Sequence, residues 1–173
     1  KDRKGVLEAL QGVGEFHRRY QHPVTFTIVG SYVPTDEYTK RIERLMQAYH
    51  LEHAARLTGV VSDQEKERLL KSSDVLIMLS KDLGDNFEGF GLVYLEANKF
   101  GIPVVGSATG GPAEAIRDGF SGFKVDNTNP GAVAEKLELI RRGALSHDNC
   151  RAWAQENEAS SKARAVLEIY QRL

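Results

Sequence analysis

The chain has 173 residues, of which 41% are hydrophobic and 27% are charged, and its formal net charge is −1. This is the composition of a globular chain with one sizeable core, and the near-neutral charge gives no electrostatic support for a nucleic-acid partner. Cys150 is the single cysteine, which excludes an internal disulfide framework. No apolar run reaches membrane-spanning length, and no signal-peptide pattern opens the sequence. We therefore expect a cytoplasmic protein.

Hydrophobic periodicity divides the chain into alternating helices and strands. Val6, Leu10 and Val13 recur with a helical period, whereas VTFTIVG at 24–30 and VLIMLS at 75–80 are short apolar runs typical of buried strands. In chain order we expect a helix over 6–20, a strand over 24–30, a helix over 35–50, a strand over 56–61, a helix over 62–72, a strand over 75–80, a helix over 91–100, a strand over 103–107, a helix over 110–119, a strand over 122–125, and helices from 130 onward with breaks near 146 and 157.

Two of these stretches carry more specific signals. The run 75–80 is almost entirely apolar, which favours a central parallel strand covered on both faces. Ser62 followed three residues later by Glu65 is a capping-box pattern, which favours a helix that starts at Ser62. The regular alternation predicts an α/β fold with a doubly wound, Rossmann-like parallel sheet.

In an open parallel sheet, ligands bind beyond the carboxyl ends of the strands. Functional residues are therefore expected directly after the predicted strands. Glycine or polar residues follow four of them, at 30–31, 59–61, 80–92 and 109–111.

The stretch NFEGFGLVYLE, residues 86–96, has the most chemistry of the four. Gly89 and Gly91 have no Cβ, so a ligand can approach the backbone closely. The predicted helix starts at this point, and the backbone N–H groups of Phe90, Gly91 and Leu92 would form an anion site in its first turn.

Two glutamates flank this helix start. Leu92 and Glu96 are four residues apart and share a helix face, so the Glu96 carboxylate could accept both hydroxyls of a ribose. Glu88, on the other side of the helix start, could hold a second hydroxylated group. A lone glutamate on a helix is usually a solvated surface charge, and the third glycine of a dinucleotide motif is missing. The prediction of a ligand site therefore depends on the two glutamates and the glycine-rich helix start occurring together.

FEGFGLVYLEANKFGIPVVGSATGGPAEAIRDGFSGFKVD resembles the carboxyl-terminal, donor-binding domain of retaining glycosyltransferases of family 4 (group 1), which have the GT-B fold. The shared pattern is E-x(7)-E around a glycine-rich turn, then E-A-x(3)-G-x-P-V-V, a glycine pair and D-G-x(2)-G. Upstream, LTGVVSD matches the loop that contacts the base, and Lys4-Gly5 matches the end of the first donor loop. The resemblance covers nearly the whole chain.

This resemblance implies roles for individual residues. Glu88 would contact hydroxyls of the transferred sugar, and Lys4 would neutralise the diphosphate leaving group, so we expect both to be catalytic. Glu96 would bind the ribose. The donor-binding residues that we expect are Gly30, Val61, Asp63, Ser80, Gly89, Phe90, Gly91, Leu92, Glu96, Gly110 and Gly111.

The expected ligand is a nucleotide diphosphate sugar, UDP- or GDP-linked, with no cofactor and no metal. Asp82 and Asp85 do not form the D-x-D metal motif of other glycosyltransferases. The base, the sugar and the acceptor are not specified by the sequence.

The resemblance also implies parts that this sequence does not contain. In the family, a strand that ends in Gly-Arg precedes the Lys-Gly pair, and an amino-terminal domain binds the acceptor. We therefore expect residues 1–173 to be a single donor domain without its first strand, inactive alone, whose last helices (146–173) pack toward the absent domain. Any peripheral membrane association would come from that absent half.

Two other readings stay open. Glu88 and Glu96 could be the acid and the nucleophile of a glycoside hydrolase, which needs two carboxylates flanking one bond in a sugar cleft. Alternatively, the chain could be a non-catalytic nucleotide-binding module or a dinucleotide oxidoreductase, although the incomplete glycine motif disfavours the oxidoreductase.

Overall fold

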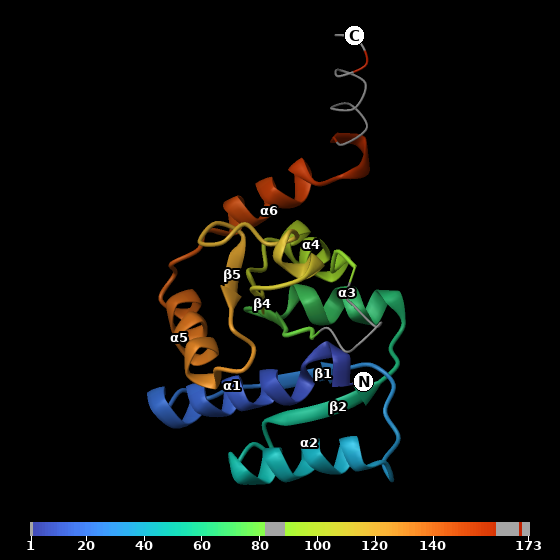
Figure 1. Ribbon diagram of the computed structural model, residues 1–173, viewed down its shortest axis with the longest axis vertical. Helices are drawn as coiled ribbons and strands as arrows, with labels where there is room; N and C mark the ends of the chain where they lie inside the picture. Colours follow the sequence, from blue (N-terminus) through green and yellow to red (C-terminus); the bar gives the residue numbers. More distant parts are fainter. Residues whose placement is uncertain (1, 82–88, 162–169, 171–173) are drawn as a thin grey trace.

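Strands and helices alternate along the chain in the computed structural model, which describes residues 2–81, 89–161 and 170 (Figure 1). The α-helices are α1 (Val6–Tyr20), α2 (Glu37–Ala48), α3 (Asp63–Lys71), α4 (Leu92–Lys99), α5 (Pro130–Arg141) and α6 (His147–Glu156), with short 3₁₀ helices η1 (Asp2–Lys4) and η2 (Gly111–Ala113). The strands are β1 (Phe26–Val29), β2 (Ala55–Gly59), β3 (Leu76–Met78), β4 (Val104–Ser107) and β5 (Gly122–Val125).

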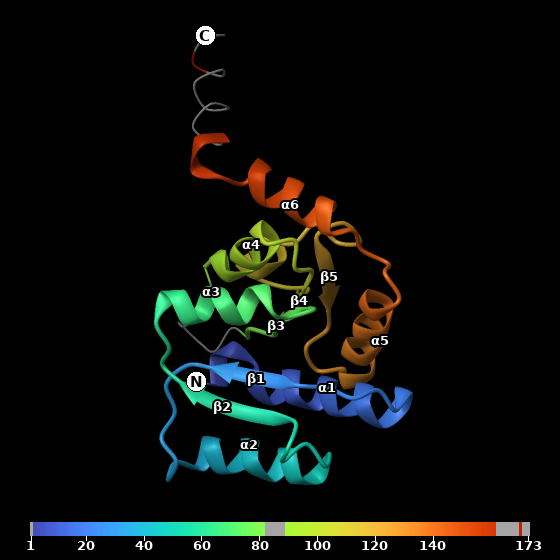
Figure 2. The ribbon, with the colours of Figure 1, turned by 180° about the vertical axis from the view of Figure 1, so that it is seen from behind.

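All the strand pairs in the described residues are parallel, which confirms the predicted α/β class. The strands form a two-stranded sheet, β1-β2, and a three-stranded sheet, β3-β4-β5. Helix α1 packs against both β1 and β3, and it therefore links the two sheets (Figure 2).

The central strand of the larger sheet is β4, whereas the sequence had favoured the run 75–80. All four residues of β4 are buried, because β3 and β5 pair with its two edges. The three residues of β3 are only half-buried. Among the described residues its partner is β4 alone, so its other edge faces the gap between the two sheets.

Helices cover both faces of the larger sheet, as a doubly wound arrangement requires. Successive residues of β4 point to opposite faces. Val105 packs with α1 and α5 in one cluster of buried side chains, and Val104 packs with α3 and α4 in a second cluster.

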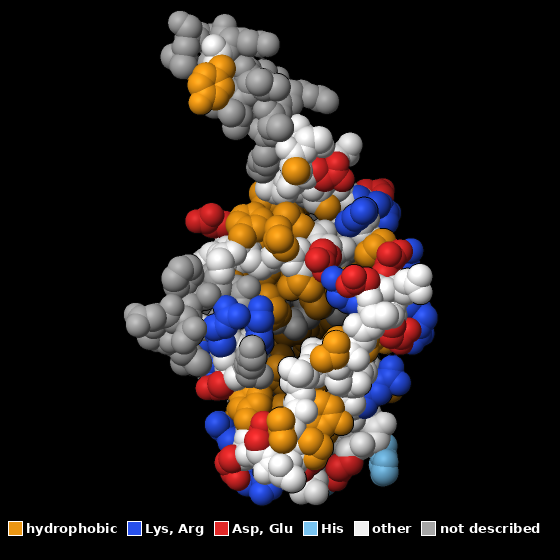
Figure 3. All heavy atoms as spheres, turned by 90° about the vertical axis from the view of Figure 1, so that its right-hand side faces the viewer, with side chains coloured by type: hydrophobic (Ala, Val, Ile, Leu, Met, Phe, Trp, Pro, Cys, Tyr) orange, Lys and Arg blue, Asp and Glu red, His pale blue; other side chains and the backbone are white. Residues whose placement is uncertain are grey.

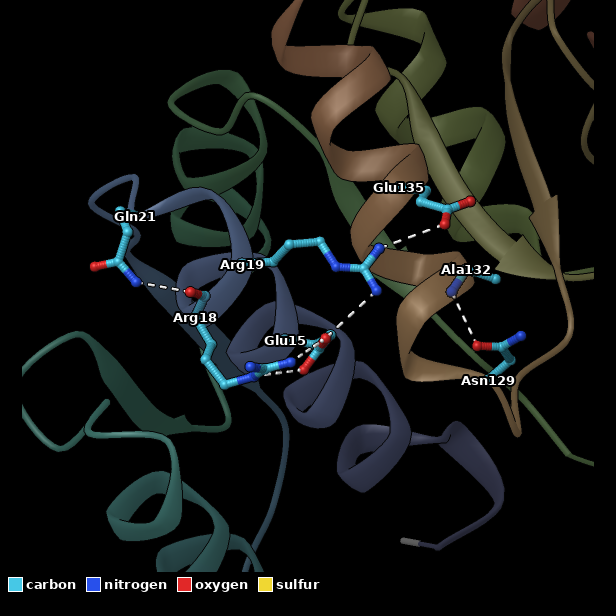
Figure 4. Close-up of polar contacts among 7 residues, drawn as sticks. All are labelled: Glu15, Arg18, Arg19, Gln21, Asn129, Ala132 and Glu135. Carbon is cyan, nitrogen blue, oxygen red and sulfur yellow. Dashed lines mark hydrogen bonds and ion pairs between the residues drawn. The ribbon is translucent and has the colours of Figure 1, made fainter.

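An exposed network of polar contacts crosses from α1 to α5 (Figure 4). The Arg19 guanidinium of α1 lies 3.4 Å from Glu135 of α5 and 3.6 Å from Glu15 of its own helix. Asn129 caps α5, since its side-chain oxygen accepts a hydrogen bond from the Ala132 N–H at 3.0 Å. Surface pairs of this kind contribute little to stability, so the buried contacts between the two helices matter more.

The prediction of a helix over 110–119 is wrong. Only Gly111–Ala113 is helical, as a 3₁₀ turn. One tertiary and one local hydrogen bond take the place of the helical ones. The indole N–H of Trp153 donates to the Ala115 carbonyl at 2.9 Å, and the Arg117 N–H donates to the nearby Ser121 hydroxyl at 3.0 Å.

Helix ends elsewhere agree with the sequence. Ser62 accepts the Glu65 N–H at 3.2 Å and so caps α3, but the Glu65 carboxylate pairs with Arg68, and only half of the capping box forms. Ser146 and Asn157 cap the two ends of α6, as predicted from the breaks in the pattern. Helix α6 packs against α4, and none of the described helices is both long and apolar enough to cross a membrane.

Candidate functional site

The loops that follow β1 and β2 lie on the same side of the molecule, on the right in Figure 1. The start of α4 lies there too. Figure 3 looks onto this side and shows a hollow whose interior is lined by hydrophobic side chains. The carboxyl ends of these strands therefore meet around one depression, where the sequence predicted the ligand.

Lys4 lies beside the carboxyl end of β3. Gly5 has a left-handed conformation (φ 65°) and packs directly on Leu79, so closely that a Cβ there would lie 1.8 Å from the Leu79 carbonyl oxygen. One residue earlier than Lys4, the Arg3 carbonyl accepts the Lys81 N–H at 2.8 Å. These contacts place the predicted leaving-group residue next to Ser80.

The Lys81 ammonium anchors the same loop from the other side. It lies 2.9 Å from Asp2 and 2.7 Å from Glu8. Partial burial opposes the charged form, but hydrogen bonds to Glu8 and Asp2 outweigh it and raise the pKa of Lys81. The first loop and the β3 end are thus held together by charge-assisted hydrogen bonds.

Helix α4 starts in the way that the anion-site prediction requires. Its N-cap is Gly91, with φ 75°, and this residue offers the first amides of the helix no side-chain capping bond. A Cβ at Gly91 would lie 2.7 Å from the Tyr94 ring and 3.7 Å from the Pro112 Cα. The Tyr94 hydroxyl donates to the Met78 carbonyl and ties α4 to β3.

The predicted ribose ligand, Glu96, lies in a groove between α3 and α4. Its carboxylate is 3.1 Å from the Lys66 ammonium, which is 3.9 Å from Asp63. The groove has a volume of about 210 Å³ and is lined by Asp63, Lys66, Glu67, Leu70, Glu96, Lys99 and Phe100. Asp63 and Glu96 thus line the same groove, and Lys66, which no sequence motif indicated, lies between them.

Two exposed apolar side chains lie a few residues before groove-lining residues in the sequence. Leu92, on the same face of α4 as Glu96, is 67% exposed, and Val60 is 79% exposed. Val61, which the sequence predicted as a base contact, is half-buried. The structure therefore offers Val60 rather than Val61 as the open apolar surface after β2.

Ser80, which was predicted to bind the donor, is buried and makes hydrogen bonds between strand ends. It is 4% exposed, and its carbonyl accepts the Ser107 hydroxyl at 2.6 Å and the Asn127 amide at 3.2 Å. This polar network joins the carboxyl ends of β3, β4 and β5. Ser107 and Asn127 were missed in the sequence, although each lies where a strand ends.

The other predicted glycines lie directly after strands or in turns. Gly30 and Gly59 end β1 and β2, and the Gly30 N–H donates to the Gly59 carbonyl at 3.0 Å. Gly110 is exposed, with φ 73°, and Gly111 opens the turn beside Gly91. A second hollow, of about 340 Å³, lies beyond β1 and is lined by Asp2, Ser31, Tyr32, Val33, Asp36 and Tyr38.

Several predicted features lie outside the described residues. Glu88, Asp82 and Asp85 belong to 82–88, so the separation of Glu88 and Glu96 is not part of the described geometry. Within residues 2–81, 89–161 and 170, no three side chains of His, Cys, Asp or Glu gather as metal ligands would.

Parallel strands, a glycine N-cap at the start of α4 and a carboxylate-lined groove between α3 and α4 are features of a Rossmann-like domain. The chain belongs to the family "Glycosyl transferases group 1", whose profile matches residues 1–158, and its fold is that of one half of a GT-B glycosyltransferase.

Two curated relatives illustrate this membership. The chain is 30% identical over 161 residues to the GDP-mannose-dependent alpha-(1-6)-phosphatidylinositol monomannoside mannosyltransferase of Mycolicibacterium smegmatis, covering 90% of the chain and 41% of the relative. It is also 30% identical over 180 residues to the D-inositol 3-phosphate glycosyltransferase of Corynebacterium urealyticum, covering 98% and 40%. The chain thus spans about two fifths of the length of these relatives.

Solved structures share the fold. A glycosyltransferase from Rickettsia africae superposes with a TM-score of 0.80 at 22% identity, covering 99% of this chain and 45% of that one. Alr3699/HepE of Anabaena in complex with UDP gives a TM-score of 0.76 at 23% identity, covering 100% and 46%.

Proposed function

We propose that this chain is the donor-binding domain of a retaining glycosyltransferase. It binds a nucleotide diphosphate sugar, UDP- or GDP-linked, and supports transfer of the hexose to an acceptor hydroxyl. The observation that carries the proposal is the arrangement around α4: an uncapped helix start at Gly91, with Glu96 facing a groove on the next turn. Lys4 lies beside the neighbouring strand end, β3.

This arrangement suits each part of such a donor. The diphosphate would lie at the start of α4, where amides and the helix dipole favour an anion. The ribose would lie at Glu96, and the base would lie against the exposed side chains of Leu92 and Val60. Glu88 would then hold the sugar.

The reaction that we propose keeps the configuration at the anomeric carbon. The bond from that carbon to the phosphate oxygen breaks while a bond to the acceptor oxygen forms on the same face. The acceptor proton passes to the leaving phosphate oxygen, and Lys4 stabilises the charge that grows on the diphosphate. Glu88 and Glu96 bind and orient the donor in this scheme.

Similar proteins differ in the base of the nucleotide that their names and structures specify. The mycobacterial relative is named GDP-mannose-dependent, whereas the Anabaena structures hold UDP, and UDP with glucose. Calorimetry with UDP-, GDP- and ADP-sugars on the full-length protein tests the proposal. Saturable binding of one of them is expected, and binding of none would reject it.

Replacing the two glutamates separately should distinguish their roles. Glu96→Ala is expected to weaken binding of the bare nucleoside diphosphate and of the nucleotide sugar alike, by about 10- to 100-fold, because hydrogen bonds to a charged group contribute about 1.5–3 kcal/mol. Glu88→Ala is expected to weaken only the nucleotide sugar. Calorimetric titration of both variants with both ligands measures this.

Glu67→Ala is a suitable control. Glu67 lines the same groove, but its carboxylate pairs with Lys71 of its own helix and, among the described residues, makes no ion pair with α4. It should bind both ligands as the wild type does. An equal loss of bare nucleotide in Glu88→Ala would contradict the division of roles. Steady hydrolysis of an oligosaccharide without nucleotide, abolished by Glu96→Gln, would instead favour a glycoside hydrolase.

We also propose that a further strand, contributed by polypeptide that precedes Lys1, fills the gap between β1 and β3. Among the described residues, β1 and β3 each have one edge without a neighbouring strand, most of their residues are partly or fully buried, and α1 already bridges them. The loop that leads into α1 passes the carboxyl end of β3, where a strand parallel to β3 would end. Right-handed connection through α1 to β1 then follows the usual rule.

Adding that preceding segment is expected to raise the melting temperature of the 173-residue chain and to protect the β1 and β3 amides from hydrogen exchange. The 173-residue chain alone should show no sugar transfer, because the acceptor-binding half would lie elsewhere in the polypeptide. An extension that leaves amide protection of both strands unchanged would contradict the added strand.

A further inference from the structure

Glu96 does not lie alone in its groove. The Lys66 ammonium of α3 lies 3.1 Å from the Glu96 Oε2 atom of α4, so the pair joins the two helices that line the groove. The Lys66 and Glu96 side chains are 41% and 44% exposed, so both keep access to solvent and to a ligand.

Contacts within α3 direct the Lys66 side chain. Ser62 caps the helix, and Asp63 on the first turn lies 3.9 Å from the Lys66 ammonium. The ammonium is therefore held between a weak contact in its own helix and a close one across the groove. The hydrogen bond to Glu96 raises the pKa of Lys66, which favours its charged form.

Such a pair contributes little to the stability of the fold, because both partners are largely solvated and screened. A contact of this size is nevertheless enough to favour one rotamer of the carboxylate over others. A glutamate on a helix surface samples several rotamers, and each must be given up when a ligand binds. A carboxylate that is already directed into the groove loses less freedom on binding.

The number of acceptor sites allows both partners at once. A carboxylate offers about four lone-pair sites, and Lys66 uses one of them on Oε2. The remaining sites suffice for two ribose hydroxyls. The ammonium has further N–H groups that can donate to the oxygens of the same hydroxyls.

We propose that Lys66 is a positioning residue for nucleotide recognition, which holds the Glu96 carboxylate in the orientation that accepts the 2′- and 3′-hydroxyls of the ribose. This inference rests on the proposed function of the site. It assigns to α3 a part in ribose recognition that acts through α4.

The test compares nucleotides with and without the ribose hydroxyls. UDP and GDP, each beside its 2′,3′-dideoxy counterpart, are titrated calorimetrically into the full-length protein and its Lys66→Met variant. Lys66→Met should weaken the ribonucleotide that the wild type binds by about 3- to 10-fold, and it should leave the weaker dideoxy ligand unchanged.

Three further variants isolate the pair. Lys40→Met removes the same charge from the exposed face of α2, away from the groove, and should bind like the wild type. Lys66→Arg, which can make the same contact, should recover most of the affinity. In a Glu96→Gln background, Lys66→Met should cause no additional loss, because its partner carboxylate is gone.

Each other result has a distinct meaning. Unchanged or tighter ribonucleotide binding by Lys66→Met overturns the inference, since Lys66 would then be neutral or would compete with the ligand. An equal loss for the dideoxy ligand also overturns it, because Lys66 would act on the phosphates. If the wild type binds neither UDP nor GDP, the proposed function fails first and this inference fails with it.

Discussion

Gly5→Ala is expected to be the most destabilising single substitution in the first loop, lowering the free energy of unfolding by about 2–5 kcal/mol, through strained backbone and overpacking together. The backbone at Gly5 has φ 65°, which residues with a Cβ adopt at a cost. An added Cβ would also lie 1.8 Å from the Leu79 carbonyl oxygen and 2.4 Å from the carbonyl carbon. Both contacts are with backbone, so no side-chain rotation can relieve them.

Thermal or urea unfolding of the variant measures this loss. A change of this size should lower the melting temperature by roughly 5–15 °C for a domain of this length. The Lys81 N–H bond to Arg3 lies in the same loop, so hydrogen exchange at the Lys81 amide should become faster as well.

Gly119→Ala is the matched control. Gly119 has nearly the same φ, 70°, but nothing lies within 4 Å of a Cβ built on it. Its replacement should therefore cost only the backbone strain, about 1 kcal/mol. Equal losses in the two variants would show that the close approach of Gly5 to β3 does not exist in solution.

The features that the sequence predicted well are those set by local patterns. The apolar period of α1, the Ser62 cap of α3 and the helix breaks near Ser146 and Asn157 each depend on residues a few positions apart. Strand positions followed from short β-branched runs, and the parallel pairing followed from the alternation with helices. For the site, the glycine at the start of α4 was enough to place an uncapped helix start there.

The features that it missed depend on contacts between distant segments. The 110–119 segment has helical composition, but Trp153, 38 positions from Ala115, takes a carbonyl that a helix would need. Ser107 and Asn127 donate hydrogen bonds to the Ser80 carbonyl only because the ends of three strands lie side by side in the fold.

Lys66 is another such case. Thirty positions separate it from Glu96, and only the packing of α3 beside α4 makes them a pair. Burial of β3 was also overestimated, because the composition of a strand does not tell which of its edges has a neighbour.

Lys4→Met is expected to reduce kcat of the full-length protein by about 10²–10³-fold, the loss typical when one group that stabilises developing charge is removed. The η1 turn and Gly5 hold Lys4 beside the carboxyl end of β3. The charge on the leaving diphosphate grows as the sugar bond breaks. The contact between Lys4 and the diphosphate should therefore be stronger in the transition state than in the ground state.

The loss should therefore fall mainly on kcat, with a change of less than about tenfold in the affinity for the nucleotide sugar. Lys40→Met removes the same charge from the exposed face of α2 and should leave both constants unchanged. Lys4→Arg keeps the charge and should retain part of the rate. If Lys4→Met instead lowered affinity by the full factor and left kcat intact, Lys4 would bind the ground state alone, and another group would have to stabilise the departing diphosphate.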